Sequence, residues 1–241
     1  LHRALGVILY RLLGSLLPTR QPPQRPQRIV LILPCCIGDV VLATATLKAL
    51  RQAWPQAHID WAVGSWSRAA IEAHDLLDGL LDTGPDALPV QTPAALLRFA
   101  ARLRAGRYDL AVSLVRSPRM GLAVWLSGIP YRAGLDSAGR GFGYNIRARI
   151  DPQAARHEAE VYLDVARALG LDTHGCYARV PVQAADRDTV RALLAARGID
   201  TPYVVIHPAG GHNPGMVMTN KRWPPQHFAA LADRLAARLG A

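Results

Sequence analysis

The chain has 241 residues, of which 50% are hydrophobic and 19% are charged, so it can bury a substantial core and is not intrinsically disordered. Its formal net charge is +10 and comes almost wholly from arginine, because Lys48 and Lys221 are its only lysines. This charge favours phosphate-bearing ligands or an anionic membrane surface, unless it reflects only the codon usage of a GC-rich genome; it is scattered and does not by itself indicate nucleic acid.

The first segment, residues 1–17, predicts an amphipathic or largely apolar helix that Pro18 ends. Arg11 interrupts its apolar run, so the run is too short to span a bilayer, which takes about 20 apolar residues. A signal peptide is disfavoured, since no small-residue cleavage site precedes the following Pro- and Arg-rich connector. Two alternatives stay open: an interfacial membrane anchor, or a helix packed on its own domain.

From Ile29 onward, apolar runs alternate with amphipathic stretches, which indicates βα units in a doubly wound, mainly parallel sheet. Strands are expected at 29–33, 58–63, 80–82, 110–114, 131–134 and 203–207. Helices are expected from about 40, and at 69–74, 93–105, 119–126, 157–169, 190–197 and 224–239. The predicted domains are an apolar and basic segment with its connector (1–27), a Rossmann-like domain (28–183) and the start of a second one (184–241).

Asp39 is a candidate general base. It follows Gly38 where the first predicted strand gives way to a helix, and ligands of open α/β sheets bind at the carboxyl ends of the strands. The alternative is a helix N-cap, a role that aspartate fills by accepting from the amides of the first helical turn. Both interpretations stay open from the residues alone.

A second candidate site lies in the glycine-rich segment 208–215 and the motif that follows it. Gly210 and Gly211 lack side chains, so their backbone amides can approach a phosphate, and Lys221 adds a positive charge close to Thr219. The segment is not a Walker loop, because no Gly-Lys-Ser/Thr occurs. The alternative is an ordinary surface turn.

The sequence offers little for metals or redox cofactors. Cys35, Cys36 and Cys176 have no metal-ligand spacing, and a disulfide between the adjacent pair is not expected, which favours a reducing cytosol. The eight histidines form no helical His-x-x-x-His pair, so a zinc site is not expected. No Gly-x-Gly-x-x-Gly follows the first strand, which argues against a nicotinamide cofactor.

The glycine-rich stretch 139–145 resembles the start of an aromatic RNA-binding strand, but its βα neighbours do not suit such a domain. The alternative is a flexible loop in which Arg140, together with Arg116, contacts an anionic acceptor.

One motif reads Ile-Leu-Pro-Cys-Cys-Ile-Gly-Asp-Val-Val-Leu-Ala-Thr-Ala-Thr at 32–46 and is followed by His-Ile-Asp-Trp-Ala-Val at 58–63. A second motif reads His-Pro-Ala-Gly-Gly at 207–211 with Lys-Arg-Trp-Pro-Pro at 221–225. In this order, the two resemble the opening of glycosyltransferase family 9 and the entry into its second domain, a family typified by ADP-heptose:lipopolysaccharide heptosyltransferases. Arg140 and residues 157–162 lie where the family has its acceptor-side loop and following helix. The resemblance runs from about residue 28 to the end.

This resemblance implies a GT-B fold, in which one Rossmann-like domain binds the acceptor and a second binds the nucleotide-sugar. It implies that Asp39 is the catalytic base and that Lys221 contacts the donor diphosphate, with Gly210, Gly211 and Thr219 beside it. Arg140, Arg116 and Gly38 are the expected acceptor contacts.

The implied activity is an inverting, metal-independent transfer of a heptose-like sugar to lipopolysaccharide core or another surface glycan, with no cofactor. The expected partners are the nucleotide-sugar, the glycan or glycolipid acceptor and the inner face of the cytoplasmic membrane, within a cytoplasmic location and without nucleic acid. The rival interpretation is a non-catalytic basic α/β module that binds anionic membrane or nucleic acid.

Two departures from the family pattern stand out. Ala45 replaces a usual proline, and the later Asp-Thr/Ser-Gly-x-x-His donor motif does not occur. Because the sequence begins with Leu1 and stops at Ala241 after a helix, we expect a fragment that transfers no sugar alone.

Overall fold

The computed structural model describes residues 2–200, 202–208 and 210–239. They form two compact units, one up to Pro181 and one from Val182, and each unit is described by itself.

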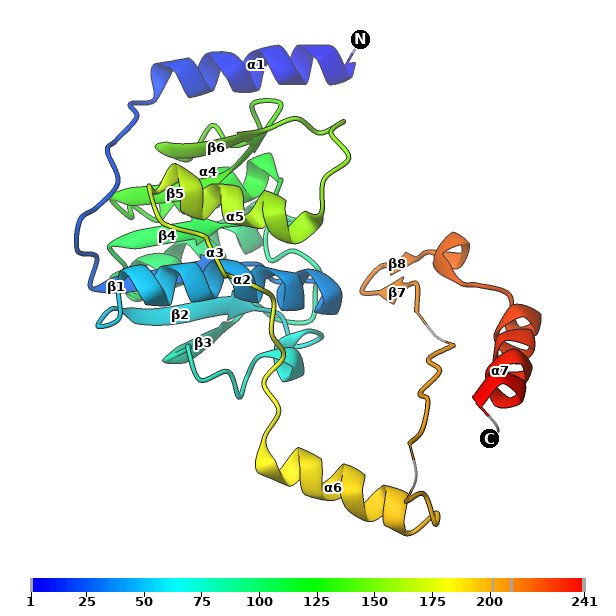
Figure 1. The fold of residues 1–241 in the computed structure, drawn as a ribbon. Coiled ribbons are helices and arrows are strands. Elements are labelled where there is room, and N and C mark those ends of the chain that lie inside the picture. Colours follow the sequence, from blue (N-terminus) through cyan, green and yellow to red (C-terminus); the bar gives the residue numbers. More distant parts are fainter. Residues whose placement is uncertain (1, 201, 209, 240–241) are drawn as a thin grey trace. The chain divides into compact units, whose positions relative to one another are not determined.

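The first unit is an α/β domain around a six-stranded sheet of order β3-β2-β1-β4-β5-β6, and every neighbouring pair is parallel (Figure 1). Its strands are β1 (Arg28–Ile32), β2 (His58–Val63), β3 (Gly79–Asp82), β4 (Leu110–Ser113), β5 (Tyr131–Ser137) and β6 (Ile146–Ile150). Its helices are α1 (His2–Leu16), α2 (Ile37–Ala53), α3 (Pro93–Ala105), α4 (Pro118–Leu126) and α5 (Glu158–Ala168), and a 3-10 turn, η1 (Arg68–Ala70), replaces the helix expected at 69–74. The predicted Rossmann-like parallel sheet is confirmed.

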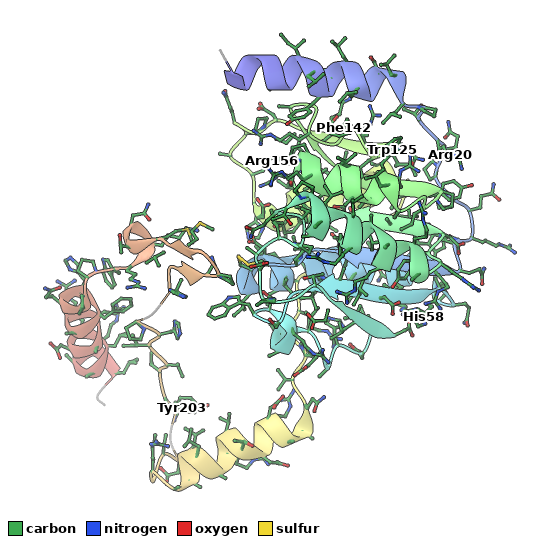
Figure 2. The ribbon with its side chains drawn as sticks, turned by 180° about the vertical axis from the view of Figure 1, so that it is seen from behind. Arg20, His58, Trp125, Phe142, Arg156 and Tyr203 are labelled. Carbon is green, nitrogen blue, oxygen red and sulfur yellow. A yellow bond between two sulfur atoms is a disulfide. The ribbon has the colours of Figure 1, made fainter. Side chains whose placement is uncertain are left out.

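Helices cover both faces of this sheet. Figure 1 shows α2 and α5 on one face, and Figure 2, from behind, shows α3 and α4 on the other. The apolar run of β1 is therefore fully buried from Ile29 to Ile32, as expected of a central parallel strand.

α2 and α5 pack directly against each other through small residues. Ala45 and Ala49 of α2 are buried against Leu163 and Ala166 of α5. Short side chains let two helices approach closely, so the first turn of α2 lies beside the first turns of α5. This packing builds the candidate site described below.

The connection from β5 to β6 differs from the prediction. β5 continues to Ser137 and β6 was not predicted, so a short return segment, 138–145, joins two parallel strands without a helix. The segment packs closely on α4. The backbone of Gly143 touches that of Gly121, and a side chain at position 143 would collide with the Gly121 backbone. The expected flexible loop is thus a tightly packed turn.

The RNA-binding interpretation of the same stretch is wrong. Phe142 and Tyr144 are buried, and the Tyr144 hydroxyl donates to Ser113 Oγ at 2.8 Å. Neither ring is exposed on a strand, so the stretch offers no platform on which bases could stack.

α1 packs on the first unit through one side. The ring of Tyr10 stacks on Phe142 at a centroid distance of 5.8 Å, and Figure 2 shows Phe142 beneath the helix. Gly14 faces Arg147, whose guanidinium would lie 3.0 Å from a Cβ at that position. One side of this helix therefore packs on its own domain, and the interfacial alternative is not tested by these contacts. None of the helices in the described part of the chain has the length and apolarity needed to cross a membrane.

The segment after α5 is tied to α2 by hydrogen bonds from three α2 residues at four-residue spacing, which places them on one stripe of the helix. Thr44 Oγ1 accepts from the Arg179 amide at 2.8 Å, and Lys48 Nζ donates to the Gly175 carbonyl at 2.8 Å. The Cys176 thiol donates to Gln52 Oε1 at 3.2 Å.

The second unit contains α6 (Ala184–Ala195), a hairpin of β7 (His212–Asn213) and β8 (Met216–Val217), the 3-10 turn η2 (Thr219–Lys221) and α7 (Pro225–Leu239). α6 begins six residues before its predicted start of 190, because the Asp186 carboxylate accepts from the Gln183 amide and so caps the helix there.

The strand predicted at 203–207 is wrong. These residues are irregular, and Val204 and Val205 are exposed. A strand needs a hydrogen-bonded neighbour, and the described residues of this unit place none beside the segment.

Candidate functional site

Asp39 lies at the point where the strand order of the sheet reverses. β1 and β4 are neighbours, but the chain continues from β1 to β2 on one side and from β4 to β5 on the other. Open α/β sheets bind ligands at such a switch point. α2 begins at Ile37, with Cys36 as its N-cap in an extended conformation, so Asp39 lies in the first helical turn. The N-cap interpretation of Asp39 is therefore wrong, although a carboxylate there still interacts favourably with the helix dipole.

Tyr162 of α5 holds the Asp39 carboxylate. Its hydroxyl donates to Asp39 Oδ1 at 3.2 Å, across the packed α2–α5 interface. Burial, and then the negative charge of Asp39, raise the pKa of Tyr162 well above its ordinary value. Tyr162 therefore stays protonated and acts only as a donor to the carboxylate. Within the described residues, Asp39 Oδ2 has no hydrogen-bond partner and is free to accept a proton.

An ion pair completes the surroundings of Tyr162. Arg116, in the loop after β4, contacts Glu158 Oε1 through Nη2 at 2.5 Å. Glu158 is the first residue of α5, one turn before Tyr162, and its negative charge also raises the pKa of the Tyr162 hydroxyl. We call Asp39, Tyr162, Glu158 and Arg116 the Asp39 cluster.

The predicted acceptor residues have different outcomes. Arg116 belongs to the cluster, although its guanidinium is paired with Glu158. Gly38 precedes Asp39 in the first turn of α2 and is exposed. Among the described residues, no atom outside its immediate chain neighbours and its own helix backbone would lie within 4 Å of a Cβ at that position. Arg140 is exposed in the turn after β5, and among the described residues its side chain makes no hydrogen bond or ion pair. The acceptor roles of all three stay predictions.

Sequence reasoning missed Tyr162 and Glu158 as site residues. Both lie in the stretch 157–162 that matched the family motif, and they are four residues apart, hence on one face of the helix. That spacing was the available signal.

The cysteine prediction was wrong. Cys35 and Cys36, between β1 and α2, are joined by a disulfide across a cis peptide bond. Disulfides ordinarily join residues that are well separated along the chain, so the adjacent spacing gave no signal for this bond. The cysteine pattern therefore supplies no argument for a reducing compartment.

The second unit brings the predicted phosphate-binding residues into one small element. Gly211 accepts from the Met218 amide at 2.6 Å, and Met218 directly precedes the 3-10 turn that holds Thr219 and Lys221. The Gly210 carbonyl accepts from Arg222 Nε at 2.9 Å. Lys221 is exposed, so its ammonium is accessible to a ligand. The predicted roles of these residues are not tested by this geometry.

Metal-ligating side chains do not gather in the part of the chain that the structure describes: no group of three or more His, Cys, Asp or Glu is placed to hold an ion.

Comparison with known proteins identifies the family. The model of glycosyltransferase family 9 (heptosyltransferase) matches residues 96–239, more than half of the chain. The chain belongs to glycosyltransferase family 9. This confirms the resemblance inferred from the sequence motifs, and the family's α/β, GT-B type fold agrees with the parallel sheet of the first unit.

Individual members of family 9 are similar over most of this chain. Lipopolysaccharide heptosyltransferase 2 of Escherichia coli (strain K12) is 25% identical over 222 residues, which is 86% of this chain and 60% of that protein. The chain thus spans about 60% of the length of the curated relatives that it matches.

Solved structures agree on the fold. A family 9 glycosyltransferase from Veillonella parvula DSM 2008 has a TM-score of 0.68 and 24% identity, covering 90% of this chain and 61% of that one. An E. coli heptosyltransferase with ADP-2-deoxy-2-fluoro heptose has a TM-score of 0.56 and 20% identity, covering 87% and 65%.

Proposed function

We propose that this family 9 chain serves an inverting, metal-independent glycosyl transfer in which Asp39 is the general base. The observation that carries the proposal is the Asp39 carboxylate at the switch point of the sheet, with Oδ1 held by the Tyr162 hydroxyl at 3.2 Å and Oδ2 free among the described residues. A base fixed in one orientation can receive a proton from a bound hydroxyl without first rearranging.

The proposed reaction is a single displacement. The acceptor hydroxyl oxygen bonds to the anomeric carbon as its proton passes to Asp39 Oδ2. The bond from that carbon to the diphosphate oxygen breaks, and its electron pair leaves with the nucleoside diphosphate. One base and one displacement give inversion at the anomeric carbon. The other carboxylate of the cluster, Glu158, is paired with Arg116, whereas Asp39 Oδ2 has no hydrogen-bond partner among the described residues.

The donor is proposed to be a nucleotide-diphosphate sugar with a heptose-like group. Support comes from the relative with ADP-2-deoxy-2-fluoro heptose and from the exposed Lys221 beside the Gly210–Gly211 turn. A lysine and backbone amides can stabilise the developing diphosphate charge without a metal ion. No cofactor is needed, because the donor carries its own leaving group.

The acceptor is proposed to be a lipopolysaccharide-core or other surface glycan, consistent with the name of the E. coli relative. Arg116 and Arg140 are the cations proposed to contact its anionic groups. The rival interpretation, a non-catalytic basic module, is not favoured for a member of a glycosyltransferase family.

The proposal is tested by measuring nucleoside diphosphate release and product stereochemistry with the natural protein that carries this sequence. We expect transfer from ADP-heptose to a core glycan acceptor, unchanged by EDTA, with an anomeric configuration opposite to that of the donor in the NMR spectrum of the product. A product of retained configuration, or activity lost to EDTA and restored by a divalent cation, would contradict the mechanism.

A further inference from the structure

The apolar side of α1 faces away from the domain. Leu12 and Leu16 are 57% and 80% exposed, and Ile8, Leu9 and Leu13 are exposed beside them. The packed side carries Tyr10 and Gly14 instead. A helix on a protein surface normally buries its apolar stripe and exposes its polar one, so this arrangement is reversed. We call Ile8, Leu9, Leu12, Leu13 and Leu16 the outer face.

The chain around this helix is uniformly basic. No acidic residue precedes Asp39, whereas the same stretch contains Arg3, Arg11, Arg20, Arg25 and Arg28. A run with this composition is repelled by cationic surfaces and attracted to anionic ones.

A basic pocket lies between α1 and the end of the sheet. Its volume is about 420 Å³, and its lining includes Arg11, Arg147 and Arg149 with the single acidic side chain of Asp136. Arg147 is held by the carbonyls of Tyr144 and Phe142, while Arg11 and Arg149 make no hydrogen bond or ion pair among the described residues.

Two arginines at this pocket therefore remain available to an anion. Asp136 balances part of the charge only, and one of its oxygens is already engaged by the Gly141 amide at 3.0 Å.

We propose that the outer face of α1 docks on an anionic phospholipid bilayer, with Arg11 and Arg149 meeting the headgroup phosphates. The five apolar side chains would enter the boundary between headgroups and acyl chains, with the helix lying parallel to the membrane plane. A second copy of the chain is a poorer occupant, because pairing two identical outer faces would bring their flanking arginines together. The docking does not rest on the proposed transfer reaction, since neither donor nor acceptor takes part in it.

The test is vesicle flotation of the 241-residue chain, with phosphatidylcholine vesicles and with vesicles that also contain phosphatidylglycerol. The double variant Leu12→Gln/Leu16→Gln is expected to lower partitioning into the anionic vesicles by about tenfold or more. Leu97→Gln is the matched control, because Leu97 on α3 is 59% exposed, like Leu12, but lies on no apolar face of this kind. Circular dichroism melting should give the same midpoint for all three proteins, since the substituted side chains are exposed.

The charge is tested with Arg11→Gln/Arg149→Gln, against Arg98→Gln on α3 as the control. The double variant should lose most of the preference for phosphatidylglycerol, whereas Arg98→Gln should keep it. Equal flotation of the wild-type chain and the Leu12→Gln/Leu16→Gln variant would overturn the proposal. So would a wild-type chain that fails to float but sediments as a dimer that the same leucine substitutions dissociate, because the outer face would then bind a second copy.

Discussion

Replacing Asp39 by asparagine distinguishes between two roles of this residue, that of a catalytic base and that of a residue that only stabilises its helix. Asparagine has nearly the same shape, and its side-chain oxygen can still accept from the Tyr162 hydroxyl, which now stands 3.2 Å from Oδ1. The substitution therefore removes the charge and the basicity while leaving the packing of α2 on α5 in place.

The two interpretations predict effects of very different size. A carboxylate in the first turn of a helix contributes about 0.3–1 kcal/mol through the helix dipole, or a decrease in Tm of at most about 4 °C for a unit of this length. Loss of a general base lowers turnover by roughly 10²- to 10⁴-fold, which corresponds to about 3–5 kcal/mol of transition-state stabilisation. We expect the large kinetic loss together with the small thermal one.

The assay measures kcat with saturating donor and acceptor in the natural protein that carries this sequence, together with its melting curve and its donor affinity. Donor affinity should be unchanged, because the proposed role of Asp39 is to take the proton of the acceptor hydroxyl. Near-normal kcat with a clear loss of melting temperature would refute the reasoning and leave Asp39 as a helix-stabilising residue only.

Three further outcomes are expected. Tyr162→Phe should lower kcat about fivefold without weakening donor binding, because a hydroxyl–carboxylate hydrogen bond of 3.2 Å is long and contributes about 1 kcal/mol. An unchanged kcat would show that Tyr162 does not position Asp39. Lys221→Ala should weaken nucleoside diphosphate binding by about 10- to 100-fold in calorimetry, whereas the exposed control Arg234→Ala should not. Burial lowers the pKa of His74 below its ordinary 6.5, so the folded state binds a proton there less readily than the unfolded state does. The free energy of unfolding should therefore decrease as the pH falls below 6.5. His74→Gln should make the free energy of unfolding, measured by denaturation, less dependent on pH in that range.

The central part of the fold could be predicted from the sequence because each strand or helix there is indicated by its own residues. The apolar run Ile29–Ile32 predicts a strand buried on both faces, and the helix that follows it placed Asp39 at the edge of the sheet. β6 was missed because its sequence, Ile-Arg-Ala-Arg-Ile at 146–150, follows a return segment without a helix, and parallel strands are ordinarily separated by one.

The contact between Asp39 and Tyr162 could not be read from local patterns. The two residues are 123 positions apart, and only the close packing of small residues such as Ala45 and Ala166 between their helices brings them together. The strand prediction at 203–207 was wrong for a related reason. An apolar run forms a strand only when a neighbouring strand is present to pair with its backbone N–H and C=O groups.

The stripe of α2 residues that holds the following segment has a mechanical consequence. Thr44, Lys48 and Gln52 bind that segment along the length of the helix, as far as the Arg179 amide. Backbone rotation that leaves these bonds intact can therefore begin only at Val180, next to Pro181 at the end of the first unit. Any displacement of the held segment acts on α2 itself, the helix whose first turn carries Asp39.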